Sequence, residues 1–264
     1  MNLYYAESQL SNFSYNINAK NVTLYKGMHM SVDGNNKYTV MQKSAYENDA
    51  NRWNITNLDP VVGSFNAHND WSDYEFLFKD IDCKDKLVLD FGCGPGRNLV
   101  KYSGRFKRVD GVDIAEKNLQ NSVMWINHNK IDIQKHNLFL CNGVDLSNIT
   151  DDEYDIVMST ICMQHICVHK IRYNYFKEFY RVLKPGGYIT IQMGYGTPSP
   201  ATVDYYDDYY DATSTNRGCD TNISDYSQLE KDLLEIGFKN FKHYIRPTGP
   251  GDHHPNWIFF NAQK

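Results

Sequence analysis

The fold is decided by residues 87–96, which read Leu87-Val88-Leu89-Asp90-Phe91-Gly92-Cys93-Gly94-Pro95-Gly96. The short run of apolar residues predicts a buried strand. The three glycines that follow, at every second position, predict a tight turn whose backbone a ligand can approach closely. Residues 97–103 fit a helix, and the first amide groups of a helix have no partner within it, so they can bind a ligand.

From about residue 86 onward, short apolar runs alternate with amphipathic ones, which is typical of repeated strand–helix units in an α/β domain. The pattern predicts strands at Leu87–Phe91, Arg108–Val112, Leu138–Cys141, Asp155–Ser159, Tyr188–Met193, Phe241–Ile245 and Trp257–Asn261. It predicts helices at Arg97–Ser103, Glu116–Asn127, Lys170–Leu183 and Ser224–Ile236.

Two regions depart from this alternation. Residues 195–223 hold glycine, proline and an acidic, tyrosine-rich segment at 204–211, so we interpret them as a loop insertion on the substrate side. In residues 1–85, two amphipathic pieces, Val40–Trp53 and Asn69–Ile81, are predicted to be helical. We therefore expect residues 1–85 to cap the active site of a single domain at 86–264.

The glycine turn differs from the dinucleotide fingerprint GxGxxG, because Arg97 stands where the third glycine of that fingerprint is expected. Asp90 lies two residues before the first glycine, where a carboxylate would repel a diphosphate but suits the ammonium group of an amino acid. Asp113 ends the next predicted strand, at a distance along the chain where an acid binds ribose hydroxyls. Together these features indicate a nucleoside that carries a positively charged amino-acid tail.

The ordered set of motifs resembles the class I S-adenosylmethionine-dependent methyltransferases over residues 86–194. The motifs are Asp90-x-Gly92-x-Gly94-x-Gly96, Asp113, Asn142-Gly143-Val144-Asp145-Leu146, Tyr154-Asp155-Ile156-Val157 and Arg181-Val182-Leu183-Lys184-Pro185-Gly186-Gly187. The resemblance implies a doubly wound, Rossmann-like sheet of seven mostly parallel strands with helices on both faces, and S-adenosylmethionine as the cofactor.

The resemblance also implies roles for individual residues. The turn at Gly92–Gly96 would hold the methionine part of the cofactor, with Asp90 acting on its ammonium group. Asp113 would bind both ribose hydroxyls, and Ile114 would pack on the adenine. The remaining cofactor contacts expected are Asp145 to the adenine amine, the Leu146 amide to the adenine ring, and Ser159 at the end of the fourth strand.

Open α/β sheets bind ligands beyond the carboxyl ends of their strands, and the segments expected there carry three histidines, whose pKa near neutrality suits a general base. The candidate catalytic residues are His165, His253 and His254. The candidate acceptor-binding residues are Tyr46 and Trp53 in the cap and Tyr205, Tyr206 and Tyr209 in the acidic segment. Each of these histidines and aromatic residues also has a purely structural interpretation, in packing or in orienting a loop.

Composition restricts the partners. The formal charge is −5 with a pI near 6.0 and no basic stripe, so a nucleic-acid substrate is not expected. No apolar stretch approaches the ~18 residues of a membrane span, and the six cysteines form no CxxC pair, which favours a cytoplasmic protein with reduced thiols. No third ligand accompanies His253 and His254 at zinc-like spacing, so no metal is expected.

These observations favour a methyltransferase that acts on a hydroxyl or amine of a small polar metabolite, and a sugar is the first guess because an acidic, tyrosine-rich loop suits polyols. Two alternatives stay open. One is a nicotinamide-dependent oxidoreductase, which the GxGxG spacing and Asp90 oppose. The other is a non-catalytic cofactor-binding subunit that supports a partner protein.

Overall fold

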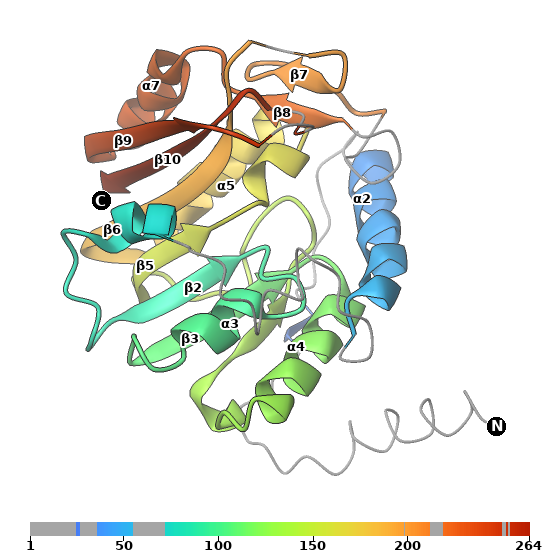
Figure 1. The fold of residues 1–264 in the computed structure, drawn as a ribbon, viewed down its shortest axis with the longest axis vertical. Coiled ribbons are helices and arrows are strands. Elements are labelled where there is room, and N and C mark those ends of the chain that lie inside the picture. The colour runs from blue at the N-terminus through green and yellow to red at the C-terminus, as the bar shows by residue number, and fades with distance from the viewer. Residues whose placement is uncertain are drawn as a thin grey trace.

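The computed structural model describes residues 25–26, 36–54, 72–197, 199–211, 219–249, 252 and 254–264. Figure 1 shows a central sheet with helices packed on both of its faces. The strands of this sheet are β1 (Tyr25–Lys26), β2 (Leu87–Phe91), β3 (Arg108–Asp113), β4 (Leu138–Leu140), β5 (Tyr154–Ser159), β6 (Leu183–Tyr195), β9 (Lys239–Pro247) and β10 (Asn256–Gln263). The helices are α2 (Asn36–Asp49), α3 (Arg97–Tyr102), α4 (Glu116–His128), α5 (His169–Val182) and α7 (Tyr226–Ile236), with 3₁₀ turns η1 (Ala50–Arg52), η3 (Ser72–Phe78), η4 (Ile133–Lys135) and η5 (Met163–His165).

The strand order is β1-β4-β3-β2-β5-β6-β10-β9. The strands from β1 to β6 in this order are parallel, and β10 runs antiparallel to both β6 and β9. The order reverses between β2 and β5, so the chain winds outward in both directions from the centre of the sheet. The predicted doubly wound sheet of seven strands is confirmed, and the two-residue β1 adds an eighth at one edge.

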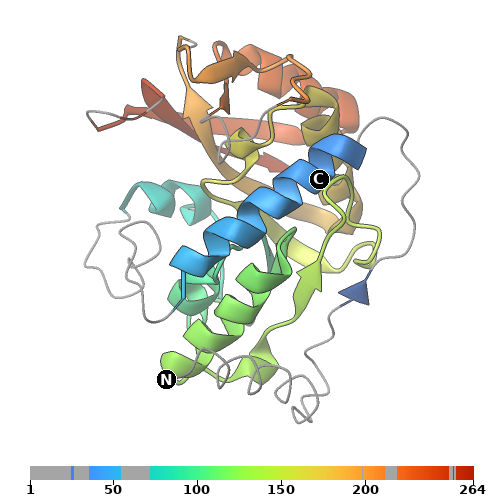
Figure 2. The same cartoon turned by 90° about the vertical axis from the view of Figure 1, so that its right-hand side faces the viewer.

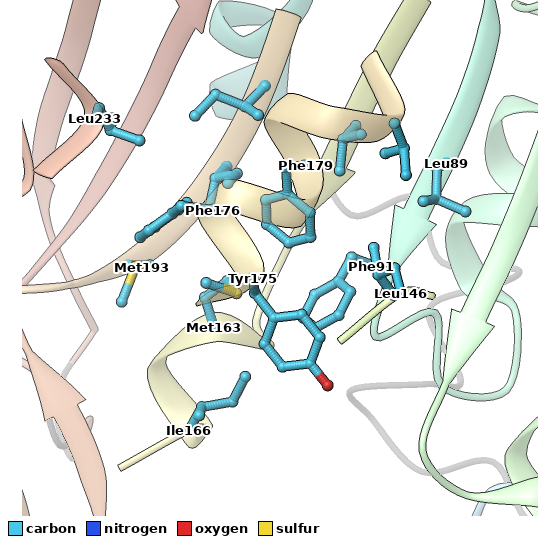
Figure 3. Close-up of a cluster of buried hydrophobic side chains, with 14 of the residues drawn as sticks. Leu89, Phe91, Leu146, Met163, Ile166, Tyr175, Phe176, Phe179, Met193 and Leu233 are labelled. Atoms are coloured by element: carbon cyan, nitrogen blue, oxygen red, sulfur yellow. The ribbon is translucent and has the colours of Figure 1, made fainter. Parts of the chain in front are cut away.

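Alternation along the central strands divides the core between the two faces of the sheet. Leu89 and Phe91 of β2 face one side, and Val88 faces the other. On the first side, Phe91 packs against Tyr175 and Phe179 of α5, with ring centroids 4.5 and 4.9 Å away. Figure 3 shows this aromatic cluster, with the hydroxyl of Tyr175 at its margin. Because Phe91 directly precedes the glycine turn, this packing fixes the position of the start of the turn relative to the sheet.

Helix α2 lies across the molecule beside α4 (Figure 2). The Glu47 carboxylate of α2 accepts hydrogen bonds from the backbone nitrogens of Glu116 (2.7 Å) and Lys117 (3.2 Å), and so caps the first turn of α4. Asn121 of α4 returns a hydrogen bond to the carbonyl of Ala50 at 2.8 Å. An acid at a helix N-terminus satisfies amides that lack a partner and complements the helix dipole, so these contacts dock α2 firmly.

One expectation about local structure was wrong, and a second was met only in part. Residues 195–223 are not simply a loop, because β7 (Thr202–Asp204) and β8 (Asp220–Asn222) pair in parallel as a second, two-stranded sheet and β8 is buried. The segment Asn69–Ile81 is helical over Ser72–Phe78, but as the 3₁₀ helix η3 and not as an α-helix. Across the described residues, no helix is long and apolar enough to cross a membrane.

Candidate active site

A pocket of about 200 Å³ opens where the carboxyl ends of β2, β3, β4 and β5 meet helix α2. Its lining combines the glycine turn, the end of β3, the loop after β5 and one side of α2. The lining residues are Tyr38, Gln42, Tyr46, Trp53, Phe91, Gly92, Cys93, Gly94, Pro95, Arg97, Asn98, Val112, Asp113, Ile114, Asn118, Cys141, Gly143, Thr160, Ile161, Cys162, His165, Ile166 and Tyr175.

The backbone conformation and hydrogen bonds of the glycine turn leave one of its sides open. Gly92 and Gly94 have φ of +69° and +53°, a conformation that side chains disfavour. The backbone nitrogen of Gly92 donates to the Val112 carbonyl at 2.9 Å, and that of Gly94 donates to the Asp113 carboxylate at 2.9 Å. A Cβ built on Gly94 would have no atom within 4 Å, so this side of the turn faces open space. Gly96 does not line the pocket, and a Cβ there would meet Ser122 of α4.

Asp90 lies directly beneath this turn and is 1 % exposed. Its Oδ1 accepts a hydrogen bond from Asn98 at 3.2 Å, while Oδ2 is a buried atom with no hydrogen-bond partner among the described residues. Burial raises the pKa of Asp90 to about 7, although Asn98 and Arg97 oppose the shift. Asp90 does not itself line the pocket, although its chain neighbour Phe91 and its partner Asn98 do. A cationic ligand group nearby would stabilise the charged carboxylate.

Asp113 lines the pocket at the end of β3 and already accepts three hydrogen bonds. The donors are the backbone nitrogens of Gly94 (2.9 Å) and Ala115 (2.8 Å) and the side chain of Asn118 (3.1 Å). A carboxylate offers about four lone-pair sites, so capacity for a ligand hydroxyl remains. Burial raises the pKa of Asp113, and these donors offset part of the increase. Ile114 lines the same wall, as expected for a contact with the adenine.

The structure does not bring Asp145, Leu146 or Ser159 to the pocket. Asp145 accepts from Asn142 (2.8 Å) in a local turn, and the Leu146 nitrogen donates to Glu178 of α5 at 2.9 Å. The Ser159 hydroxyl donates to the Phe91 carbonyl at 3.0 Å. Near Asp145 and Leu146, the residues that line the pocket are Cys141 and Gly143, and directly after Ser159 they are residues 160–162.

Of the two predicted catalytic histidines that the structure describes, only His165, in η5, lines the pocket. Its Nδ1 lies 2.8 Å from Oδ1 of Asp220 in β8. Burial disfavours the charged imidazole, but the Asp220 carboxylate outweighs burial, so the pKa of His165 is raised. Burial likewise opposes charge on Asp220, yet His165 and His254 together hold its pKa below the usual range. The result is an ionised carboxylate hydrogen-bonded to a histidine at the pocket wall.

His254 does not line the pocket. It is 2 % exposed and lies behind Asp220, with Nε2 3.3 Å from Oδ2 of that carboxylate. Its predicted role as a base in contact with substrate conflicts with this burial. His253 lies outside the described residues.

Of the predicted acceptor-binding residues, Tyr46 and Trp53 line the pocket and the three tyrosines of the acidic segment do not. Tyr205 is fully buried, and its hydroxyl donates to Asp232 of α7 at 2.9 Å. Tyr206 and Tyr209 are 42 % and 36 % exposed on the surface. The segment thus packs on α5 and α7, away from the pocket.

Three polar residues of the site were missed by sequence reasoning. They are Gln42 of α2, Asn118 of α4 and Asp220 of β8. Gln42 Oε1 and Asn118 Oδ1 are buried, belong to lining residues and have no hydrogen-bond partner among the described residues. No local motif marks Gln42 or Asp220, because each acts with residues distant in sequence, and Asn118 was missed although its partner Asp113 is only five residues away.

Comparison with known proteins supports the interpretation of the fold. The family described as "Methyltransferase domain" matches residues 89–191. Sterol methyltransferase-like 3 of Botryococcus braunii is 26 % identical over 176 residues, which cover 64 % of this chain and 42 % of that protein. The chain therefore spans about two fifths of the length of this curated relative.

Solved structures agree in fold at low identity. Haemonchus contortus phosphoethanolamine N-methyltransferase 2, in complex with phosphomonomethylethanolamine and S-adenosylhomocysteine, superposes with a TM-score of 0.58 at 18 % identity, covering 89 % of this chain and 61 % of that one. The putative methyltransferase of Haloferax volcanii, solved with its Trm112 activator, gives 0.58 at 15 % identity, covering 84 % and 96 %. Residues 89–191 thus match a methyltransferase domain, and the sheet built around them has the fold of these solved methyltransferases.

Proposed function

We propose that this chain transfers a methyl group from S-adenosylmethionine to a hydroxyl or amine of a small polar acceptor, with His165 as the general base. The observation that carries the proposal is the 2.8 Å contact between His165 Nδ1 and Asp220 Oδ1 in the wall of the pocket that also holds the glycine turn. The glycine turn expected to bind the cofactor and the oriented histidine proposed as the base thus line the same pocket.

The cofactor end of the pocket fits S-adenosylmethionine, which when bound supplies an electrophilic methyl group. The open face of Gly94 gives space beside the backbone, and Asp113 retains capacity for a ribose hydroxyl. Asn118 Oδ1 is a buried acceptor with no hydrogen-bond partner among the described residues, so it can receive a further hydroxyl or amine hydrogen. The buried Asp90 beneath the turn favours a ligand with a positive charge.

Asp220 determines which nitrogen of His165 is basic. A carboxylate only accepts hydrogen bonds, so Nδ1 of His165 donates to Asp220 and carries the ring proton. In the neutral ring the lone pair is then on Nε2, which can take the proton of the acceptor as the methyl group is transferred. Asp220 also stabilises the imidazolium that forms.

The side chain of Gln42 favours a methyl acceptor that carries an N–H or O–H group. Its Nε2 donates to the Tyr38 hydroxyl at 2.7 Å and to the His165 carbonyl at 2.9 Å. A carbonyl cannot donate, so the amide orientation is fixed and Oε1 is left as the acceptor without a partner. An N–H or O–H on the substrate beside His165 would satisfy Oε1, which suits an amine or a polyol such as a sugar. Tyr46 and Trp53 line the same pocket and can stack on a ring.

A calorimetric titration separates this function from the alternatives. We expect micromolar binding of S-adenosylhomocysteine, a higher melting temperature with it, and no binding of NAD. Binding of NAD alone would favour an oxidoreductase.

An acceptor screen with amines and sugars then tests catalysis. His165→Gln should lower turnover by about 10²–10⁴ and leave S-adenosylhomocysteine affinity intact. His243→Gln, a histidine of β9 that does not line the pocket, is the matched control. Full turnover in His165→Gln would refute the base, and no turnover with any acceptor would favour a non-catalytic subunit.

A further inference from the structure

Two free cysteines that do not line the pocket, Cys167 and Cys219, lie against each other. Cys167 belongs to the loop after β5 (residues 160–168, the His165 loop), and Cys219 directly precedes β8. The Cys167 thiol donates to the carbonyl oxygen of Cys219 at 3.0 Å. The two side chains form a small buried cluster of their own, so each thiol has the other as an immediate neighbour.

Contacts beside the pair hold the His165 loop alongside β8. His165 Nδ1 lies 2.8 Å from Asp220 Oδ1, and the Thr221 hydroxyl donates to the Ile166 carbonyl at 3.1 Å. Arg172 of α5 donates to the same carbonyl and to the same hydroxyl. A disulfide needs two Cβ atoms that face each other at close range. Because these contacts keep both segments side by side, joining the two sulfurs requires little movement of the backbone.

The two thiols differ in exposure and in acidity. Cys167 is fully buried, whereas Cys219 is 9 % exposed. The hydrogen bond from the Cys167 thiol lowers the pKa of the Cys219 thiol, although burial opposes the shift. Burial raises the pKa of the three pocket cysteines, Cys93, Cys141 and Cys162. Since the thiolate is the form that reacts with an oxidant, Cys219 is the thiol of this pair that reacts first.

We propose that Cys167 and Cys219 are a redox modification site, where a peroxide joins the two thiols in a disulfide that holds the His165 loop on β8. The bond connects positions 52 residues apart, and a cross-link of that span stabilises the folded state by restricting the unfolded chain. It also keeps His165 against Asp220, and this consequence for catalysis rests on the proposed function.

The reaction has two steps. The Cys219 thiolate attacks one oxygen of hydrogen peroxide, the O–O bond breaks, and hydroxide leaves a sulfenic acid on Cys219. The Cys167 sulfur then attacks the Cys219 sulfur, so that the S–S bond forms as the S–O bond breaks, and the Cys167 proton ends in water. Two thiols and one peroxide thus give one disulfide and two water molecules. The two sulfurs lose one electron each to the peroxide oxygens.

Mass spectrometry of the full chain after treatment with hydrogen peroxide tests the site and needs no methyl acceptor. We expect two peptides joined through Cys167 and Cys219, lighter than the reduced pair by two hydrogen atoms and separated by dithiothreitol. The melting temperature should rise by roughly 5–10 °C on oxidation and return on reduction. Hydrogen exchange of the amides of residues 165–168 should slow by about tenfold in the oxidised protein.

Three variants control the experiment. Cys219→Ser removes the thiol that reacts first and should abolish both the cross-link and the rise in melting temperature. Cys167→Ala should stop the reaction at the Cys219 sulfenic acid, which dimedone traps. Cys83→Ser, at a buried cysteine outside the pair, should form the cross-link as the wild type does. A chain that stays reduced, a disulfide between other cysteines, or unchanged hydrogen exchange in the cross-linked loop would overturn the proposal.

A heat challenge adds the catalytic readout. The oxidised protein should keep its methyl transfer after heating that inactivates the reduced protein, because the cross-link holds His165 against Asp220. If His165→Gln keeps full turnover, the proposed base is wrong, while mass spectrometry and the melting temperature still decide whether the disulfide forms.

Discussion

A Cβ on Gly92 would lie 2.0 Å from the sulfur of Cys162, so the glycine turn and the loop after β5 are in direct contact across the floor of the pocket. Gly92 also has φ of +69°. The cofactor turn and the His165 loop therefore depend on a single residue without a side chain.

Gly92→Ala should destabilise the protein by about 1–3 kcal/mol, because the methyl group is overpacked against Cys162 and the backbone is strained. Denaturant unfolding measures this loss. Gly104→Ala is the control, since a Cβ there has no atom within 4 Å. Equal stability of the two variants would show that the turn adapts.

Asp113→Ala should weaken S-adenosylhomocysteine binding by about 1–3 kcal/mol, the cost of removing a charged acceptor from ribose hydroxyls. It should also lower stability, because Gly94, Ala115 and Asn118 lose their shared acceptor. Calorimetry and thermal unfolding measure both. Asp145→Ala, outside the pocket, should leave affinity nearly unchanged, and a comparable loss there would place the adenine contact at Asp145 after all.

Asp90→Asn should be more stable than the wild type at pH 8. The folded pKa of Asp90, about 7, exceeds its ordinary value of 3.8. Between about pH 4 and 7 the folded state holds a proton that the unfolded chain has released, so stability falls as pH rises through this window. Three pKa units correspond to at most about 4 kcal/mol. Denaturant unfolding from pH 4 to 8 should show the stability of Asp90→Asn relative to the wild type increasing with pH. A difference in stability that is the same at every pH would contradict the raised pKa of Asp90 as its cause.

Arg172→Ala should cost about 3–5 kcal/mol. This guanidinium is fully buried and donates to the carbonyls of Ile166 and Tyr205 and to the Thr221 hydroxyl. It thereby ties the His165 loop to β8. Arg52→Ala is the control, because its ion pair with Asp49 is exposed and worth little. If Arg172→Ala loses less than about 1 kcal/mol of unfolding free energy, other contacts connect the His165 loop to β8.

The sequence alone determined the α/β domain, most strand positions and the glycine turn, because these depend on patterns within a few residues. Residues 87–96 carry both the apolar run and the positive-φ positions, and Asp113 lies one strand–helix unit away. Parallel pairing of β2 with β3 then brings Asp90 and Asp113 to the same edge of the sheet. The pocket-lining Gly92, Gly94 and Asp113 were therefore predictable from local order, whereas the predicted Asp145, Leu146 and Ser159 do not line the pocket.

The other end of the pocket depends on contacts between elements that are distant in sequence. Asp220 is 55 residues from His165, and Gln42 reaches the carbonyl of His165 from 123 residues away. The polar sequence of residues 195–223 gave no sign that β8 is buried. Nothing in the sequence near His254 showed that Gly194 of β6 leaves space for the ring of His254. Such contacts depend on how elements that are distant in sequence pack together. The free energy of the whole fold determines that packing, and the spacing of residues along the chain does not show it.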